Sequence, residues 1–149
     1  MDRGLIKGEA VPVQINANVP GRRGAASAER QLRVQLGHLV ATRAVDRQLM
    51  GHAAGRAFVM SCLRRHQSGD WGDLGSHDAE ANDLALVTGA RVLSSYLIPG
   101  QVRQGAGAEP DSGPRLREVI ADERLWIITE AEDTQGIRSQ TTVLFPSDY

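Results

Sequence analysis

The chain has 149 residues, of which 41% are hydrophobic and only 4% aromatic, a composition typical of a soluble domain with an aliphatic core. The one cysteine, Cys62, excludes a disulfide framework and a multi-cysteine zinc site within one chain. The formal net charge of −1 hides a segregation of charge along the chain. Residues 1–67 carry 11 basic and 4 acidic side chains, whereas residues 68–149 carry 6 basic and 14 acidic ones.

Residues 1–35 contain prolines and glycines and no sustained hydrophobic period. Arg22 and Arg23 stand in a Gly-flanked turn within this segment. We predict a flexible basic arm, which serves either as a solvated tail or as a binding arm for a nucleic acid or another partner. Residues 36–149 are predicted to form a single α+β domain.

A helical pattern follows over residues 39–67, with Thr42 as the N-cap of a first helix and a break at 51–52. A third helix is predicted over 76–88, ended by Gly89. The second helix carries an apolar stripe at spacings of three and four: Ala54, Phe58, Val59, Cys62 and Leu63.

The period changes to that of strands after Gly89. Strands are predicted at 91–98, 124–130 and 141–145. A loop insertion is predicted at about 99–123. This order predicts an α+β fold in which two to three N-terminal helices pack on a small antiparallel β-meander of three to four strands.

Several motifs are near-misses. Ser76, His77 and Asp78 are the residue types of a hydrolase triad, but consecutive residues on a helix point about 100° apart and cannot pass a proton along. Cys62 fits the apolar face better than a nucleophile's position. No metal site and no cofactor are predicted, because metal-ligand spacing is lacking among the four histidines His38, His52, His66 and His77.

One set of polar residues stands where a helix end and three strands could meet. The set comprises His66, Tyr96, Thr129, Glu130, Arg138, Thr141 and Thr142. With His66 and Glu130 as acid and base and Arg138 stabilising negative charge, it would suffice for metal-free RNA cleavage. Arg64 and Arg65 would then hold the phosphate backbone. A purely structural interpretation stays open, in which His66 caps a helix and Glu130 pairs with Arg138.

A second hypothesis starts from the acidic half of the chain. Its acidic residues would form a face that occupies the basic, nucleic-acid-binding surface of a partner. This face comprises Asp70, Asp73, Asp78, Glu80 and Asp83. We also expect the basic end of the second helix to meet the acidic start of the third across the turn at Trp71.

The sequence resembles a family of small plasmid-related proteins of bacterial mobile elements, some of which carry a restriction-subunit label. The matching stretches span residues 38–149 in the same order: Val40-Ala-Thr42, Arg65-His-Gln-Ser-Gly-Asp-Trp-Gly-Asp-Leu74, Glu80-Ala-Asn-Asp-Leu-Ala-Leu86, Arg91-Val-Leu-Ser-Ser-Tyr96, Leu125-Trp-Ile-Ile-Thr-Glu-Ala131, Thr141-Thr-Val-Leu-Phe-Pro146 and Asp148-Tyr149. The chain departs from the family at 99–123 and at 132–137, and the second departure affects the placement of Arg138.

The resemblance implies a toxin, an anti-defence protein or a plasmid-maintenance factor. We predict a mobile-element accessory protein that acts as a non-catalytic interaction or inhibitor protein on a host, phage or plasmid protein complex. The alternative is a metal-independent endoribonuclease-type toxin acting on RNA, so whether the chain is an enzyme stays open. No apolar run reaches the ~18–20 residues of a membrane span, and the first ten residues lack a secretory signal. We therefore expect a cytoplasmic protein without a membrane partner.

Overall fold

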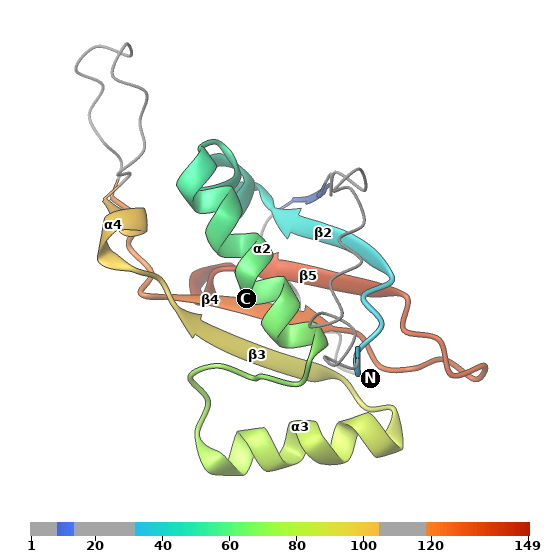
Figure 1. Cartoon of the computed structure of the whole chain (residues 1–149). Coiled ribbons are helices and arrows are strands. Elements are labelled where there is room, and N and C mark those ends of the chain that lie inside the picture. Colours follow the sequence, from blue (N-terminus) through green and yellow to red (C-terminus); the bar gives the residue numbers. More distant parts are fainter. Residues whose placement is uncertain (1–8, 14–31, 105–118) are drawn as a thin grey trace, which may run out of the picture.

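The fold comes from a computed structural model that describes residues 9–13, 32–104 and 119–149 (Figure 1). Most of the predicted basic arm and the centre of the predicted loop insertion lie outside these residues. The described strands are β1 (Ala10–Pro12), β2 (His38–Thr42), β3 (Val92–Leu97), β4 (Arg124–Thr129) and β5 (Gln140–Leu144). The helical segments are α1 (Arg43–Val45), η1 (Asp46–Met50), α2 (Ala53–Gln67), α3 (Ser76–Thr88), α4 (Gly100–Arg103) and η2 (Pro146–Asp148).

The class is α+β, and the sheet is larger than predicted. Its strand order is β1-β2-β5-β4-β3. β3, β4 and β5 pair antiparallel as expected, whereas β2 pairs parallel to β5 and antiparallel to β1. The predicted purely antiparallel meander is therefore corrected to a five-stranded mixed sheet. β1 lies within residues that we predicted as part of the arm.

The burial of β2 explains why its residues were not predicted as a strand. Four of its five residues, Leu39 to Thr42, are buried, so side chains on both faces of β2 are shielded from solvent. A strand buried on both faces lacks the alternation of apolar and polar residues that marks an exposed one. The predicted N-cap role of Thr42 is confirmed, because its side chain accepts a hydrogen bond from the Val45 amide.

The two longer helices agree with the predicted ones. α2 lies across one face of the sheet, and α3 lies beside the β3 edge (Figure 1). Gly89 ends α3 with a φ of 80°, a left-handed conformation that favours glycine. In the described part of the chain, no helix combines the length and apolarity needed to cross a membrane.

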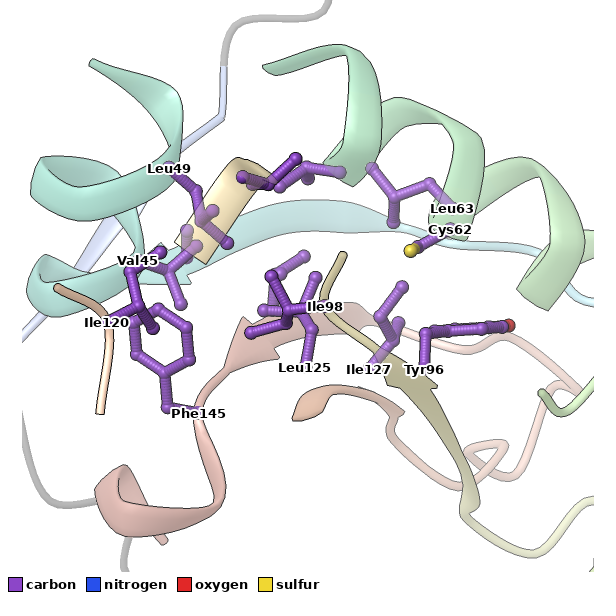
Figure 2. Packing of buried hydrophobic residues seen from close by; sticks show 14 of the residues in the cluster. Val45, Leu49, Cys62, Leu63, Tyr96, Ile98, Ile120, Leu125, Ile127 and Phe145 are labelled. Carbon is purple, nitrogen blue, oxygen red and sulfur yellow. The ribbon is translucent and has the colours of Figure 1, made fainter. Parts of the chain in front are cut away.

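The main core lies between the sheet and the α1, η1 and α2 segments. Figure 2 shows Leu49, Cys62 and Leu63 on the helical side and Leu125 and Ile127 on the strands opposite. Cys62 is buried in this cluster, and burial raises the pKa of its thiol to about 12. A thiol held in its neutral form is a poor nucleophile, so the structure favours a packing role for Cys62.

The outer edge of β3 is closed by side-chain and backbone groups. Asn82 of α3 donates from Nδ2 to the Leu93 carbonyl at 2.6 Å and accepts from the Leu93 amide at 3.1 Å. Two residues along, the Ser95 amide donates to the Trp71 carbonyl, and Ser95 accepts from the Asp73 amide. These contacts occupy an edge that would otherwise be open to strand pairing, and they attach α3 to the sheet.

Asn82→Ala tests this attachment. The variant leaves both the amide and the carbonyl of Leu93 without their partner, so we expect the free energy of unfolding to fall by about 1–3 kcal/mol. Urea denaturation followed by circular dichroism measures the change. Glu80→Ala, an exposed position on the same helix, should change stability by no more than about 0.5 kcal/mol. Equal stability of Asn82→Ala and the parent protein would contradict this role.

Candidate functional site

His66, the proposed acid or base, lies inside the protein. It stands in the last turn of α2 and has no exposed surface. Its Nδ1 lies 2.5 Å from Ser94 Oγ on β3, and its Nε2 lies 2.8 Å from Thr129 Oγ1 on β4. The Trp71 ring packs edge-on against the imidazole at 5.9 Å between centroids. Both ring nitrogens are therefore committed to neighbouring hydroxyls and not to a substrate.

The hydroxyl groups form a chain of hydrogen bonds, and the donor and acceptor in each bond can be derived from the Leu36 end. The Leu36 carbonyl can only accept, so Thr141 Oγ1 donates to it at 2.7 Å. Thr141 therefore accepts from Thr129 at 2.7 Å, and Thr129 in turn accepts from the imidazole. His66 thus carries a proton on Nε2, and in the neutral ring Nδ1 accepts from Ser94. We call His66, Ser94, Thr129, Thr141 and the Leu36 carbonyl the hydroxyl relay.

The relay is suited to a neutral imidazole. A protonated ring would donate from Nδ1 as well, so the Ser94 hydroxyl would have to turn its hydrogen away from the ring. Burial and, to a smaller extent, the positive charge of Arg138 lower the pKa of His66 from 6.5 to about 3. A group of this pKa is uncharged at neutral pH and a weak base, which does not suit general acid–base catalysis near pH 7.

Arg138 is also buried, with 4% of its surface exposed. Nη1 donates to the carbonyls of Ala90 at 2.7 Å and Glu130 at 3.0 Å, and Nη2 donates to the Ala85 carbonyl at 3.1 Å. The guanidinium thus joins the end of α3 to the residue after β4. Its positive charge stabilises the C-terminus of α3, which is the negative end of the helix dipole. It binds the backbone of Glu130, where the sequence had suggested a pair with the carboxylate.

The other residues of the ribonuclease hypothesis are dispersed. The buried Tyr96 donates its hydroxyl to the Asp70 carbonyl at 2.7 Å, and burial raises its pKa. Arg65 packs over the Tyr96 ring and pairs with the Asp70 carboxylate at 2.8 Å. Arg64 is exposed, and Glu130 is half-buried. Of the predicted set, the structure brings together His66, Thr129 and Thr141, but it does so in the interior.

The predicted acidic face divides into two groups. Asp70 pairs with Arg65, Asp73 pairs with Arg124 at 2.7 Å, and Asp83 accepts from the indole of Trp71 at 2.9 Å. These three carboxylates position the segment between α2 and α3, so the basic end of α2 meets Asp70 and not the start of α3.

The second group consists of Asp78 and Glu80. Both are exposed on α3, and neither forms an ion pair or hydrogen bond with another described residue. Asp78 lies in the first turn, where a negative charge also stabilises the helix. Glu80, further along, has no such role and is available to a partner.

Within the described residues, no group of three or more His, Cys, Asp and Glu side chains is placed to hold a metal ion. Comparisons of the chain with protein-family models, curated proteins and solved structures find no match. The assignment of function therefore depends on the geometry of the chain itself.

Sequence reasoning missed Ser94 and the Leu36 carbonyl as partners of this network. Ser94 is a buried polar residue of β3, and such a residue needs a hydrogen-bonding partner. That requirement was visible in the sequence, but the identity of the partner depends on how α2 crosses β3. The role of the Leu36 carbonyl could not be predicted from the residue types, because every residue has a backbone carbonyl.

The burial of His66 predicts a pH-dependent stability. Between pH 6.5 and about 3 the unfolded state binds a proton that the folded state does not, so the contribution is complete above pH 6.5 and is lost as pH falls. We expect a loss of at most about 1.4 kcal/mol per pH unit from this residue. Chemical denaturation across this range should show a shallower slope for His66→Gln than for the parent protein.

His77→Gln is the matched control, because His77 is exposed on α3. Its slope should equal that of the parent protein. Nitrogen-15 NMR of the imidazole should also report a proton on Nε2 and none on Nδ1 at neutral pH. A parent slope that survives in His66→Gln would contradict the buried neutral histidine.

Arg138→Lys tests the guanidinium contacts. A lysine keeps the charge but replaces the planar fork by a single ammonium, which cannot reproduce the bonds to three separate carbonyls. We expect the free energy of unfolding to fall by about 1–3 kcal/mol in thermal or urea denaturation. Arg64→Lys, at an exposed position, should stay within about 0.5 kcal/mol. Equal effects of the two variants would rule out a special role for Arg138.

Proposed function

We propose that this chain is a non-catalytic interaction protein that binds a basic surface of a protein partner through α3. The observation that carries the proposal is the exposure of α3. Nine of its thirteen residues are exposed, and the helix contains three acidic residues and no lysine or arginine. Only Asn82 and Ala85 are buried against the rest of the protein.

The distribution of hydrogen bonds supports this choice of helix. Elsewhere on the predicted acidic face, the carboxylates already bind Arg65, Arg124 or the Trp71 indole. A carboxylate engaged in this way gains less from a new cation, because the existing contact has to be given up. Asp78 and Glu80 carry no such cost, and they place negative charge on two different sides of the N-terminal half of α3.

The alternative of a metal-independent endoribonuclease is disfavoured by the location of its residues. RNA cleavage would require His66 to reach a 2′-hydroxyl or a leaving oxygen. The imidazole is inaccessible and binds Ser94 and Thr129, and the guanidinium of Arg138 binds backbone carbonyls. An active site would therefore require the relay to open.

The biological setting is also a proposal, and it rests on the resemblance to plasmid-related proteins. In that setting the partner is a protein complex of the host, a phage or another plasmid, and the chain acts in anti-defence or plasmid maintenance. A partner that binds nucleic acid offers the basic surface that α3 would occupy.

The double variant Asp78→Lys/Glu80→Lys tests the proposed function. Partners captured from bacterial lysate on the parent protein are identified by mass spectrometry, and the purified partner is titrated calorimetrically. Because two attractive contacts become repulsive, we expect the dissociation constant to rise by about tenfold or more. The increase should shrink at high salt, since exposed charges are screened.

Glu123→Lys provides the matched control, because Glu123 is exposed in the segment before β4 and away from α3. It should leave the dissociation constant nearly unchanged. An equal loss in both variants would indicate general charge attraction and contradict a site on α3. RNA cleavage by the purified protein in excess chelator, abolished in folded His66→Gln, would overturn the non-catalytic proposal.

A further inference from the structure

An exposed stripe runs along the outward side of α3. It consists of His77, Glu80, Leu84 and Val87, whose spacing of three, four and three residues places them on one side of a helix. Leu84 is 62% exposed and Val87 is 85% exposed. The buried contacts of α3 lie on the opposite side, and no described element covers this one (Figure 1).

The stripe has two chemically different halves. Its C-terminal half presents the apolar side chains of Leu84 and Val87. Its N-terminal half presents His77 and Glu80, and the helix contains no lysine or arginine. A complementary ligand must therefore offer an apolar patch and positive charge within the length of the stripe, about 15 Å at 1.5 Å per residue.

We propose that the partner element that binds α3 is a basic amphipathic helix, which packs along this stripe with its apolar side chains on Leu84 and Val87 and a lysine or arginine on Glu80. The inference rests on the proposed function and specifies its partner. A narrow, convex ridge of side chains spaced in this way fits the groove of another helix, where residues recur at the same period.

A second copy of the chain is a poorer occupant of the same stripe. In a parallel pair, the acidic halves would face each other. In an antiparallel pair, Leu84 would face Glu80 of the other copy, and a carboxylate would be covered by apolar surface without a partner. Nucleic acid is disfavoured by the negative charge of the helix.

The test uses a fluorescein-labelled synthetic peptide of about 18 residues with leucines at helical spacing and lysines elsewhere. A peptide of the same composition in scrambled order is the control. Fluorescence anisotropy with the full chain should show that the amphipathic peptide binds about tenfold more tightly than the scrambled one. The same titration is then repeated with chain variants.

Val87→Glu separates helix docking from simple charge attraction. The variant adds negative charge, so purely electrostatic binding of a lysine-rich peptide would become tighter. Docking on the apolar half predicts the reverse, a rise of about fivefold or more in the dissociation constant. Leu97→Glu adds the same charge at another exposed apolar residue, on β3, and should not weaken binding.

The outcomes distinguish this inference from the proposed function. Unchanged or tighter binding by Val87→Glu, or equal affinity for the two peptides, overturns the amphipathic-helix inference. If Asp78→Lys/Glu80→Lys still weakens the captured partner in that case, the proposed function stands without it. If no α3 variant weakens binding of the peptide or of the captured partner, both the inference and the proposed function are overturned. Self-association of the parent chain in sedimentation, abolished by Val87→Glu, would assign the stripe to a second copy.

Discussion

A buried imidazole needs a partner for each of its two nitrogens, and this requirement shapes the centre of the protein. His66 obtains them from Ser94 on β3 and Thr129 on β4, and the relay continues through Thr141 on β5 to the Leu36 carbonyl before β2. One chain of hydrogen bonds therefore ties α2 to three strands of the sheet and to the entry of a fourth. Burial holds the pKa of His66 low, and protonation of Nδ1 would reverse its hydrogen bond with Ser94, so this connection is sensitive to acid.

The charge segregation of the sequence acquires a structural meaning around Trp71. Arg65 from the basic half pairs with Asp70 from the acidic half, while Asp73 pairs with Arg124 within the acidic half. Side chains of both halves thus hold the segment that covers β3. The carboxylates of α3 that remain exposed give the surface the negative character from which we infer a basic partner.

The relation between sequence and structure differs from element to element. The third helix is confirmed over 76–88, because its end is set locally by a glycine in the left-handed conformation. β2 was not predicted as a strand, and residues 39–42 were placed at the start of a helical pattern, because a strand shielded on both faces shows no alternation. His66, Thr129 and Thr141 were grouped in advance as polar residues that the fold could bring together. Their accessibility was not predictable, because it depends on how α2 lies across the sheet.

The sequence by itself determined the α+β class, the bounds of α3, the three antiparallel strands and the segregation of charge, since these follow from local periodicity, caps and composition. Only the tertiary structure decided that β2 joins β5 in parallel, that His66 and Arg138 lie inside, and which carboxylates stay exposed. The physical reason is that burial and hydrogen-bond partners belong to pairs of segments far apart in the chain. A residue's type limits the contacts that it can make, and the packing of those segments selects among them.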